Sequence, residues 1–334
     1  MSAEQRPKVL LMHQILDPGP ALLAGAPVEV VAYPNEGQLS EEAIRDAAEA
    51  HGCRGILSQV MDPLGQTVLS TPGLRIVSNV AVGFDNIDLD AATRHGVMAT
   101  NTPGVLTDTT ADFAFTLMMA AARRVAEGDR FVRAGRFNGW AIDMLLGQDV
   151  WGATLGLVGV GRIGGAVARR ARAFDMRIIY TDEVPLPPET ERQLGATRVG
   201  LPTLLHEADF VSLHVPLTAQ TRHLIGSEQL AQMKPTAVLV NTSRGPVVDE
   251  AALADALRRK VIFAAGLDVF EREPEVHPDL RALDSIILAP HIASGSVRTR
   301  SEMCALAVRN LLAGLQGERP PNLLNPEVLH RVAG

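Results

Sequence analysis

Three ionisable residues follow short apolar runs in the second half of the chain. Arg244 comes after AVLV, Glu273 after FAAGLDVF, and His291 after SIILAP. If these runs are consecutive strands of a parallel sheet, the three side chains share its carboxyl edge, where such sheets bind ligands. Each residue taken alone is more often a surface ion-pair or capping residue. Their common placement makes a shared site the better interpretation.

These three residue types could together reduce a carbonyl group. A protonated His291 can give a proton to the carbonyl oxygen, where negative charge grows as hydride adds to the carbon. Glu273 can hydrogen-bond to the imidazole, orient it and favour its protonated form. Arg244 can bind a carboxylate and polarise the neighbouring carbonyl. The trio therefore predicts a 2-oxo acid substrate.

A glycine-rich loop supplies a second sign of chemistry. The segment LVGVGRIGGAVARRA has Gly159, Gly161 and Gly164 in the pattern G-x-G-x-x-G, between a hydrophobic run and a helical pattern. In this context the backbone amides and the helix dipole bind a pyrophosphate. We expect the three glycines, with Arg162 and Ile163 at the start of the helix, to bind a dinucleotide.

Asp182 ends the next predicted strand, in MRIIYTD. A carboxylate there accepts hydrogen bonds from both hydroxyls of the adenosine ribose and repels a 2′-phosphate. The expected cofactor is NAD(H), with NADP(H) less favoured. Arg162 and Arg169 leave some tolerance for NADP(H).

The elements that must position these residues form two βα series. The first predicts strands within residues 8–13, 28–33, 55–58, 74–79 and 96–100, with a helix capped by Ser40 and a short helix in DLDAATRHG. The second predicts strands within residues 154–160, 176–182, 209–216, 237–241, 263–270 and 285–290, and ends in a helix over residues 297–315. Alternating strands and helices predict α/β folding with parallel sheets covered on both faces.

Residues 107–135 predict one long helix between the two series. Apolar residues lie nearly all round it, among them Phe113, Phe115 and Met118, so it is buried on more than one side. Two interpretations stay open: a core helix, or a helix at a domain junction or subunit interface.

Length, net charge and composition limit the number of domains, the possible partners and the possible location. A chain of 334 residues predicts about two domains. The net charge of −7 argues against nucleic acid and mildly against anionic membranes. No segment is apolar enough for a membrane span or a signal peptide, and two cysteines without metal spacing predict neither disulfides nor a metal site. The expected location is the cytoplasm.

The sequence resembles the D-isomer-specific 2-hydroxyacid dehydrogenases over nearly its whole length, and within them the glyoxylate/hydroxypyruvate reductases most. The matching motifs occur in order: NVAVGFDNIDLDAA, TNTPGVLTDTTAD, GVGRIGGAVARRARAFDM, LHVPLTAQTRHLI, NTSRGPVVDE, GLDVFEREP and APHIAS.

The resemblance implies roles for individual residues. Arg244 matches the substrate-binding arginine, His291 the proton donor, and Glu273 its partner. Positions that line the cofactor in the family are matched by Val215, Pro216, Thr242 and Asp268, the last near the nicotinamide amide. Val82 and Gly83 match a turn whose amides hold the substrate carboxylate.

The resemblance also implies an interrupted architecture. A flavodoxin-like substrate domain would comprise residues 1–101 and 296–334, and a Rossmann-type NAD-binding domain residues 102–295. Family members are usually homodimers, with the helix after Thr107 in the interface. In residues 135–152, Trp140, Met144 and Leu145 could reach a substrate pocket or only pack in that interface. The segment SQVMDP, residues 58–63, could form a loop over the substrate.

Other functions stay open at this point. Glyoxylate, hydroxypyruvate, 2-ketogluconate and pyruvate share the carboxylate and carbonyl that the trio would bind. An NAD-sensing corepressor on the same fold is a second hypothesis, although no extra docking segment supports it. Formate oxidation is a third, and it ranks low because formate enzymes of the family have glutamine where Glu273 stands.

Overall fold

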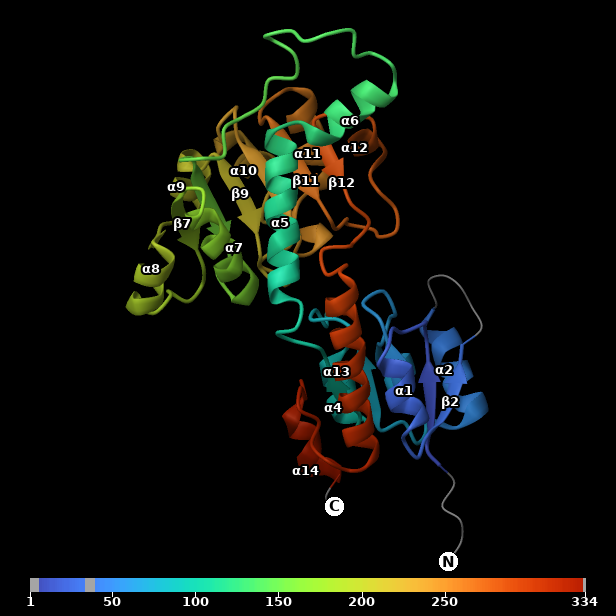
Figure 1. The fold of residues 1–334 in the computed structure, drawn as a ribbon. Coiled ribbons are helices and arrows are strands. Elements are labelled where there is room, and N and C mark those ends of the chain that lie inside the picture. The colour runs from blue at the N-terminus through green and yellow to red at the C-terminus, as the bar shows by residue number, and fades with distance from the viewer. Residues whose placement is uncertain (1–5, 34–39, 333–334) are drawn as a thin grey trace, which may run out of the picture. The chain divides into compact units, whose positions relative to one another are not determined.

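The computed structural model describes residues 6–33 and 40–332. By its internal contacts the chain forms two compact units (Figure 1). Unit 1 is Met1–Leu106 with Gly295–Gly334, and unit 2 is Thr107–Ser294. Residues 1–5, 34–39 and 333–334 of the predicted substrate domain lie outside the described residues.

Unit 1 is built on a parallel sheet of five strands in the order β2-β1-β3-β4-β5. The strands are β1 (Lys8–Leu11), β2 (Glu29–Ala32), β3 (Cys53–Ser58), β4 (Ile76–Asn79) and β5 (Met98–Thr100). The helices are α1 (Gly19–Ala24), α2 (Glu41–His51), α3 (Gln66–Leu69), α4 (Leu89–Arg94), α13 (Val297–Leu315) and α14 (Leu329–Val332), with a 3-10 turn at Pro326–Val328. This strand order is the flavodoxin-like one.

Local chemistry explains the elements of unit 1. The hydroxyl of Ser40 caps α2 by accepting from the amide of Ala43 at 3.3 Å, and Gly52 ends the helix in the left-handed region. Helix α13 brings the end of the chain into unit 1, where Ser78 Oγ donates to the carbonyl of Ala307 at 2.8 Å.

Unit 2 contains a parallel sheet of seven strands in the order β12-β11-β10-β9-β6-β7-β8. The strands are β6 (Thr154–Val158), β7 (Arg177–Thr181), β8 (Ala196–Arg198), β9 (Phe210–Leu213), β10 (Val238–Asn241), β11 (Ala264–Leu267) and β12 (Ile286–Leu288). The helices are α5 (Thr107–Ala122), α6 (Val125–Arg133), α7 (Arg162–Arg172), α8 (Pro188–Leu194), α9 (Leu201–Glu207), α10 (Ser227–Gln232), α11 (Glu250–Arg258) and α12 (Pro278–Arg281), with a 3-10 turn at Gly245–Val247. The order reverses at β6, as in doubly wound dinucleotide-binding folds.

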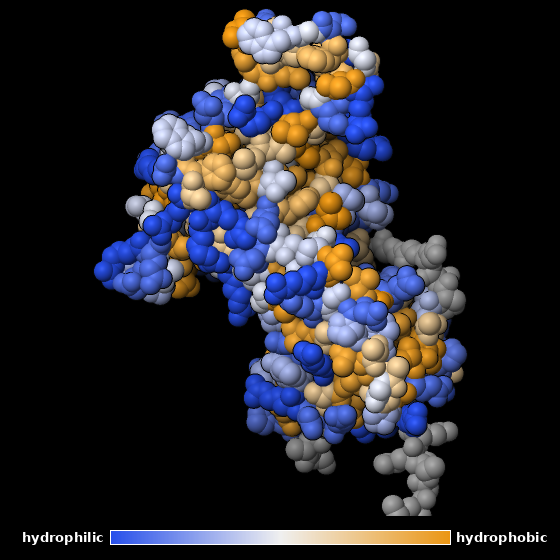
Figure 2. Space-filling model, viewed as in Figure 1, coloured by the Kyte–Doolittle hydropathy of each residue, from blue (hydrophilic) through white to orange (hydrophobic). Residues whose placement is uncertain are grey.

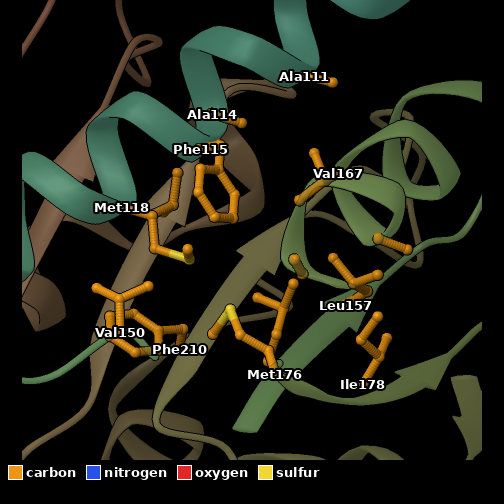
Figure 3. Packing of buried hydrophobic residues seen from close by; sticks show 14 of the residues in the cluster. Ala111, Ala114, Phe115, Met118, Val150, Leu157, Val167, Met176, Ile178 and Phe210 are labelled. Atoms are coloured by element: carbon orange, nitrogen blue, oxygen red, sulfur yellow. The ribbon is translucent and has the colours of Figure 1, made fainter. Parts of the chain in front are cut away.

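Two apolar cores cover the two faces of this sheet. On one face α5 and α7 pack over the strands, with Phe115 and Met118 of α5 near Val167 of α7 and Phe210 of β9 (Figure 3). On the other face α9, α10 and α11 contribute a second cluster. The strands are therefore buried on both sides, and the predicted fold class is confirmed.

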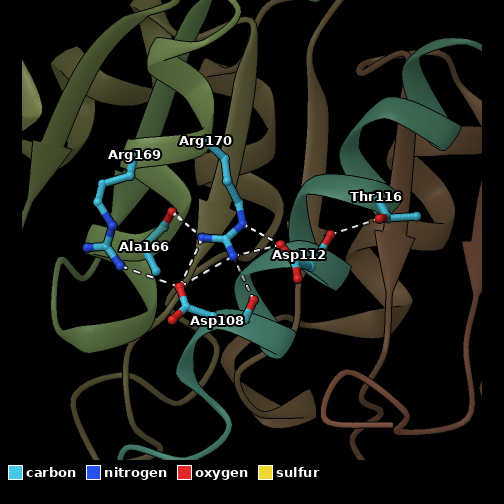
Figure 4. A network of polar contacts seen from close by, with 6 residues as sticks. All are labelled: Asp108, Asp112, Thr116, Ala166, Arg169 and Arg170. Carbon is cyan, nitrogen blue, oxygen red and sulfur yellow. Dashed lines mark hydrogen bonds and ion pairs between the residues drawn. The ribbon is translucent and has the colours of Figure 1, made fainter. Parts of the chain in front are cut away.

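Polar contacts also join α5 to α7 (Figure 4). Arg170 Nε donates to Asp112 Oδ1 at 2.6 Å, and its Nη2 donates to the carbonyl of Asp108 at 3.0 Å. Arg169 lies 3.5 Å from the Asp108 carboxylate. Such exposed pairs add little stability. These contacts do orient the Arg169 side chain towards α5. Arg169 is one of the two residues that were expected to give tolerance for NADP(H).

The structure corrects two expectations. The predicted long helix is two helices, α5 and α6, because Arg124 between them is left-handed with φ 51°. The carbonyl of Ala122 at the end of α5 accepts instead from Gln148 at 2.9 Å. The short strand β8 and helix α9 were not predicted, because three residues and seven residues are too few for a clear period.

Candidate active site

His291 and Glu273 form a hydrogen-bonded pair beyond the carboxyl ends of neighbouring strands β12 and β11. His291 Nδ1 lies 2.8 Å from Glu273 Oε2, and the other carboxylate oxygen accepts from the amide of Phe270 at 2.9 Å. The Glu273 side chain is 15% exposed and that of His291 33%. A carboxylate partner places a proton on Nδ1, which leaves Nε2 as the nitrogen for proton transfer.

Asp268 holds the segment that carries His291. Its two carboxylate oxygens accept from the amides of Ile292 and Ala293 at 2.7 and 2.8 Å, and its carbonyl accepts from the amide of His291 at 2.9 Å. These bonds fix His291 in the left-handed region, with φ 52°. Burial raises the pKa of Asp268, while the two amides oppose this rise. The structure thus gives Asp268 a part in orienting the imidazole.

Arg244 follows β10, the next strand in the sheet. Its carbonyl accepts from Asn241 Nδ2 at 2.9 Å, and its Nη1 donates to the carbonyl of Ser243 at 2.8 Å. A Cβ built on Gly245 would lie 1.9 Å from the carbonyl carbon and oxygen of Phe270. Only glycine allows the loop of Arg244 to touch the loop of Glu273 so closely.

Two glutamates hold these loops together by a reciprocal contact, which we call the clasp. Neither glutamate was assigned a role from the sequence. Glu271 Oε1 accepts from the amide of Glu250, and Glu250 Oε1 accepts from the amide of Glu271, both at 2.8 Å. His223 Nε2 lies 3.1 Å from the other Glu271 oxygen, which ties in the loop after β9. Burial raises the pKa of Glu250. Glutamates far apart in the chain carry no sequence signal for such a reciprocal contact.

The glycine loop has the geometry expected for a pyrophosphate. Gly159 has φ +90°, and its amide donates to the carbonyl of Thr181 at 2.9 Å. A Cβ at Gly164 would lie 2.2 Å from the carbonyl oxygen of Gly159, so strand and helix could not pack this closely. Gly161 is the N-cap residue of α7, and a Cβ built there meets no described atom within 4 Å. Arg162 and Ile163 form the first turn of α7.

Asp182 stands just beyond β7, beside this loop. Its Oδ2 accepts from the amide of Val160 at 2.7 Å, so the carboxylate is anchored next to the phosphate-binding turn. Arg198 donates to the carbonyl of Asp182 at 2.8 Å. These residues fit a dinucleotide with its ribose at Asp182.

The other predicted cofactor residues also follow strands of this sheet. Val215 and Pro216 come after β9 and Thr242 comes after β10. The hydroxyl of Thr242 is buried and has no hydrogen-bond partner among the described residues. A buried donor of this kind suits an amide oxygen of a bound ligand. His214, behind the glycine loop, lies 2.9 Å from Ser212 Oγ, and burial lowers its pKa to about 4.

Val82 and Gly83 lie in unit 1, in the turn after β4. The carbonyl of Val82 accepts from Asn101 Nδ2 at 2.7 Å, and that of Gly83 from Asn79 Nδ2 at 3.1 Å. Both carbonyls are thus held by buried asparagines. Within the described residues, no group of three or more His, Cys, Asp or Glu could hold a metal ion, and no helix is long and apolar enough to cross a membrane.

Comparison with known proteins identifies the class. Residues 115–293 match the family model of the D-isomer specific 2-hydroxyacid dehydrogenase, NAD binding domain. The chain belongs to the D-isomer-specific 2-hydroxyacid dehydrogenase family and is an oxidoreductase with a nicotinamide cofactor. The predicted resemblance is confirmed.

Individual relatives show which members of the family the chain resembles. The chain is 50% identical over 328 residues to a glyoxylate reductase of Korarchaeum cryptofilum, covering 97% of each protein. Among solved structures, a glyoxylate reductase from Paecilomyes thermophila is 35% identical, with a TM-score of 0.85 and coverage of 96% of this chain and 99% of that one. An NADPH-dependent glyoxylate/hydroxypyruvate reductase from Sinorhizobium meliloti, solved with NADP and malonate, is 34% identical, with a TM-score of 0.81 and coverage of 97% and 98%.

Proposed function

We propose that the chain reduces glyoxylate or hydroxypyruvate with NADH, and in reverse oxidises the D-2-hydroxy acid. The observation that carries this proposal is the 2.8 Å pair of His291 and Glu273 at the carboxyl edge of a dinucleotide-binding sheet. The glyoxylate reductases to which the chain is similar support the choice of substrate.

Each residue of the proposed site has its own role in the reduction. A bound reduced nicotinamide supplies the hydride. His291 Nε2 gives its proton to the carbonyl oxygen, while its Nδ1–H stays bonded to Glu273. Arg244 binds the substrate carboxylate through its planar fork of donors. In unit 1, Val82 and Gly83 are the residues proposed for substrate binding, through their backbone amides. Asp268 and Thr242 bind the nicotinamide amide.

A substrate panel tests the proposal. Glyoxylate, hydroxypyruvate, pyruvate and 2-ketogluconate are each assayed with NADH by loss of absorbance. We expect turnover of the first two, and a kcat lower by ~10²–10⁴-fold in His291→Ala, the range for loss of a general acid. His206→Ala, an exposed residue of α9, is the matched control. An unchanged kcat in His291→Ala would refute the assignment.

The preference for NAD over NADP rests on Asp182. Its carboxylate, anchored to Val160, would oppose the 2′-phosphate of NADP. Replacement by serine should raise KM for NADH and improve the use of NADPH. A wild-type enzyme that uses NADPH as well as NADH would contradict this assignment.

A homodimer is the proposed assembly. Helix α6 and residues 135–151 expose several large apolar side chains, in a part of unit 2 where Figure 2 shows apolar surface. Trp140 is 80% exposed, Ile142 77% and Trp151 72%. Patches of this kind on soluble proteins mark interaction sites. Light scattering should give a dimer mass, and Trp140→Ser with Ile142→Ser should shift it towards the monomer.

Unit 1 is the proposed substrate domain and unit 2 the proposed NAD-binding domain. A reducing compartment, the cytoplasm, suits the two buried free thiols of Cys53 and Cys304.

A further inference from the structure

An exposed arginine stands beside the proposed ribose site of unit 2. Arg198 is the last residue of β8, and its Nη2 donates to the carbonyl oxygens of Asp182 and Glu183 at 2.8 and 3.3 Å. Within residues 6–33 and 40–332, its guanidinium forms no ion pair with a carboxylate, and its Nε and Nη1 form no hydrogen bond. Arg198 therefore keeps its positive charge and most of its N–H donors for another partner.

The two arginines that were expected to give tolerance for NADP(H) are placed differently. Arg169 lies 3.5 Å from the Asp108 carboxylate. Arg162 lies in the first turn of α7, at the loop that is proposed to bind the pyrophosphate. Arg198 comes from β8, the strand that pairs with β7. Of the three, Arg198 is the one that hydrogen-bonds to Asp182 itself.

The two charged groups at this position would act on a 2′-phosphate in opposite ways. A carboxylate accepts hydrogen bonds from the ribose hydroxyls and repels a phosphate in their place. A guanidinium binds a phosphate through its planar fork of donors. The Asp182 carboxylate and the carbonyl that accepts from Arg198 belong to the same residue. A phosphate on the 2′-oxygen of a ribose held by Asp182 would therefore lie within reach of both groups.

We propose that Arg198 is a further specificity-determining residue for the cofactor, as the cation that binds the 2′-phosphate of NADP(H) when Asp182 is replaced. This inference rests on the proposed function, which assigns the adenosine ribose to Asp182. In wild type, Asp182 and the following Glu183 oppose the guanidinium with like negative charge, and the amide of Val160 anchors the Asp182 carboxylate at 2.7 Å. The preference for NADH is thus set by opposed charges rather than by Asp182 alone.

Variants made in the Asp182→Ser background isolate the guanidinium. Arg198→Gln removes the charge but keeps an N–H donor, whereas Arg198→Lys keeps the charge. Arg177→Gln is the matched control, because Arg177 begins β7 at the opposite edge of the sheet and pairs there with Glu207. Arg162→Gln tests the arginine at the glycine loop.

The measurement is the Kd for NADPH and for NADH, by fluorescence titration without substrate. We expect Asp182→Ser to bind NADPH at least ~10-fold more tightly than wild type, because a repelling charge is gone. Adding Arg198→Gln should weaken NADPH ~10- to 100-fold, the cost of removing the charged partner of a phosphate. The Kd for NADH should change less than about threefold, which also shows that the variant is folded. Arg198→Lys should keep most of the gain, and Arg177→Gln and Arg162→Gln should leave the ratio of the two Kd values unchanged.

Three results would overturn the proposal. Equal weakening of NADPH and NADH by Arg198→Gln would mean that Arg198 only holds the loop. The others are no weakening of either cofactor, and a selective loss of NADPH in Arg162→Gln that Arg198→Gln does not show. If Asp182→Ser brings no gain for NADPH, the ribose assignment of Asp182 is refuted and this inference with it. Failure of the proposed reaction is distinct, because wild-type enzyme would then turn over neither glyoxylate nor hydroxypyruvate, whatever the Kd values.

Discussion

Replacement of Glu273 by glutamine tests how the proton donor is controlled. Glutamine keeps the size of the side chain, and its oxygen can still accept from the amide of Phe270. Its NH₂ group then faces His291 Nδ1, where wild type has a carboxylate oxygen at 2.8 Å. Two donors cannot bond to each other, so the imidazole must accept at Nδ1 in the variant instead of donating there.

The structure sets the size of the effect. A hydrogen bond to a charged group contributes ~1.5–3 kcal/mol. The carboxylate is mostly buried but the imidazole is a third exposed, so we take about 2 kcal/mol, from the middle of that range. This corresponds to a ~30-fold fall in kcat for 2-oxo acid reduction.

The assay is steady-state reduction of glyoxylate by NADH at pH 7. We expect Glu273→Gln to lose activity, because its amide group cannot accept a hydrogen bond from Nδ1–H of the imidazole. KM for NADH should not change. Glu275→Gln, an exposed site two residues away, is the control. A kcat within twofold of wild type at pH 7 would refute the reasoning.

Three further predictions follow from burial and backbone contacts. Because burial lowers the pKa of His214 from 6.5 to about 4, the unfolded chain binds a proton more readily, so stability is lost as pH falls from 6.5 towards 4. Urea unfolding at pH 7.5 and 5 should show up to about 2 kcal/mol of this loss, absent in His214→Gln. Glu271→Ala breaks the clasp between loops and should lower kcat at least ~10-fold without changing the Kd for NADH in fluorescence titration. Gly164→Ala should raise that Kd at least ~10-fold, whereas Gly165→Ala, whose Cβ meets its nearest atom at 4.0 Å, should not.

Strand ends and the glycine loop were predictable because their signals are local. Buried parallel strands are continuous apolar runs, so a charged residue directly after one marks the carboxyl edge of the sheet. Arg244, Glu273 and His291 each follow such a run, and the structure places their strands side by side as β10, β11 and β12. The cap at Ser40 was equally predictable, and its hydroxyl accepts from the amide three residues on.

Contacts between distant segments were not predictable from one sequence. The helix break at Arg124 depends on residues 147–148, which lie against the carbonyl of Ala122. The clasp of Glu250 and Glu271 joins residues of like charge, which pairing rules would keep apart. In both cases tertiary contacts outweigh local propensity.

The carboxylates of unit 2 share one means of support. Glu273, Asp268, Glu271 and Asp182 each accept from a main-chain amide. For Glu273 that amide is three residues away, in the same short motif, whereas for the other three it is 21 to 24 residues away, in a different loop or helix. A short motif therefore supplies both Glu273 and the backbone that holds it, but the remaining carboxylates keep their places only where the fold brings two loops together.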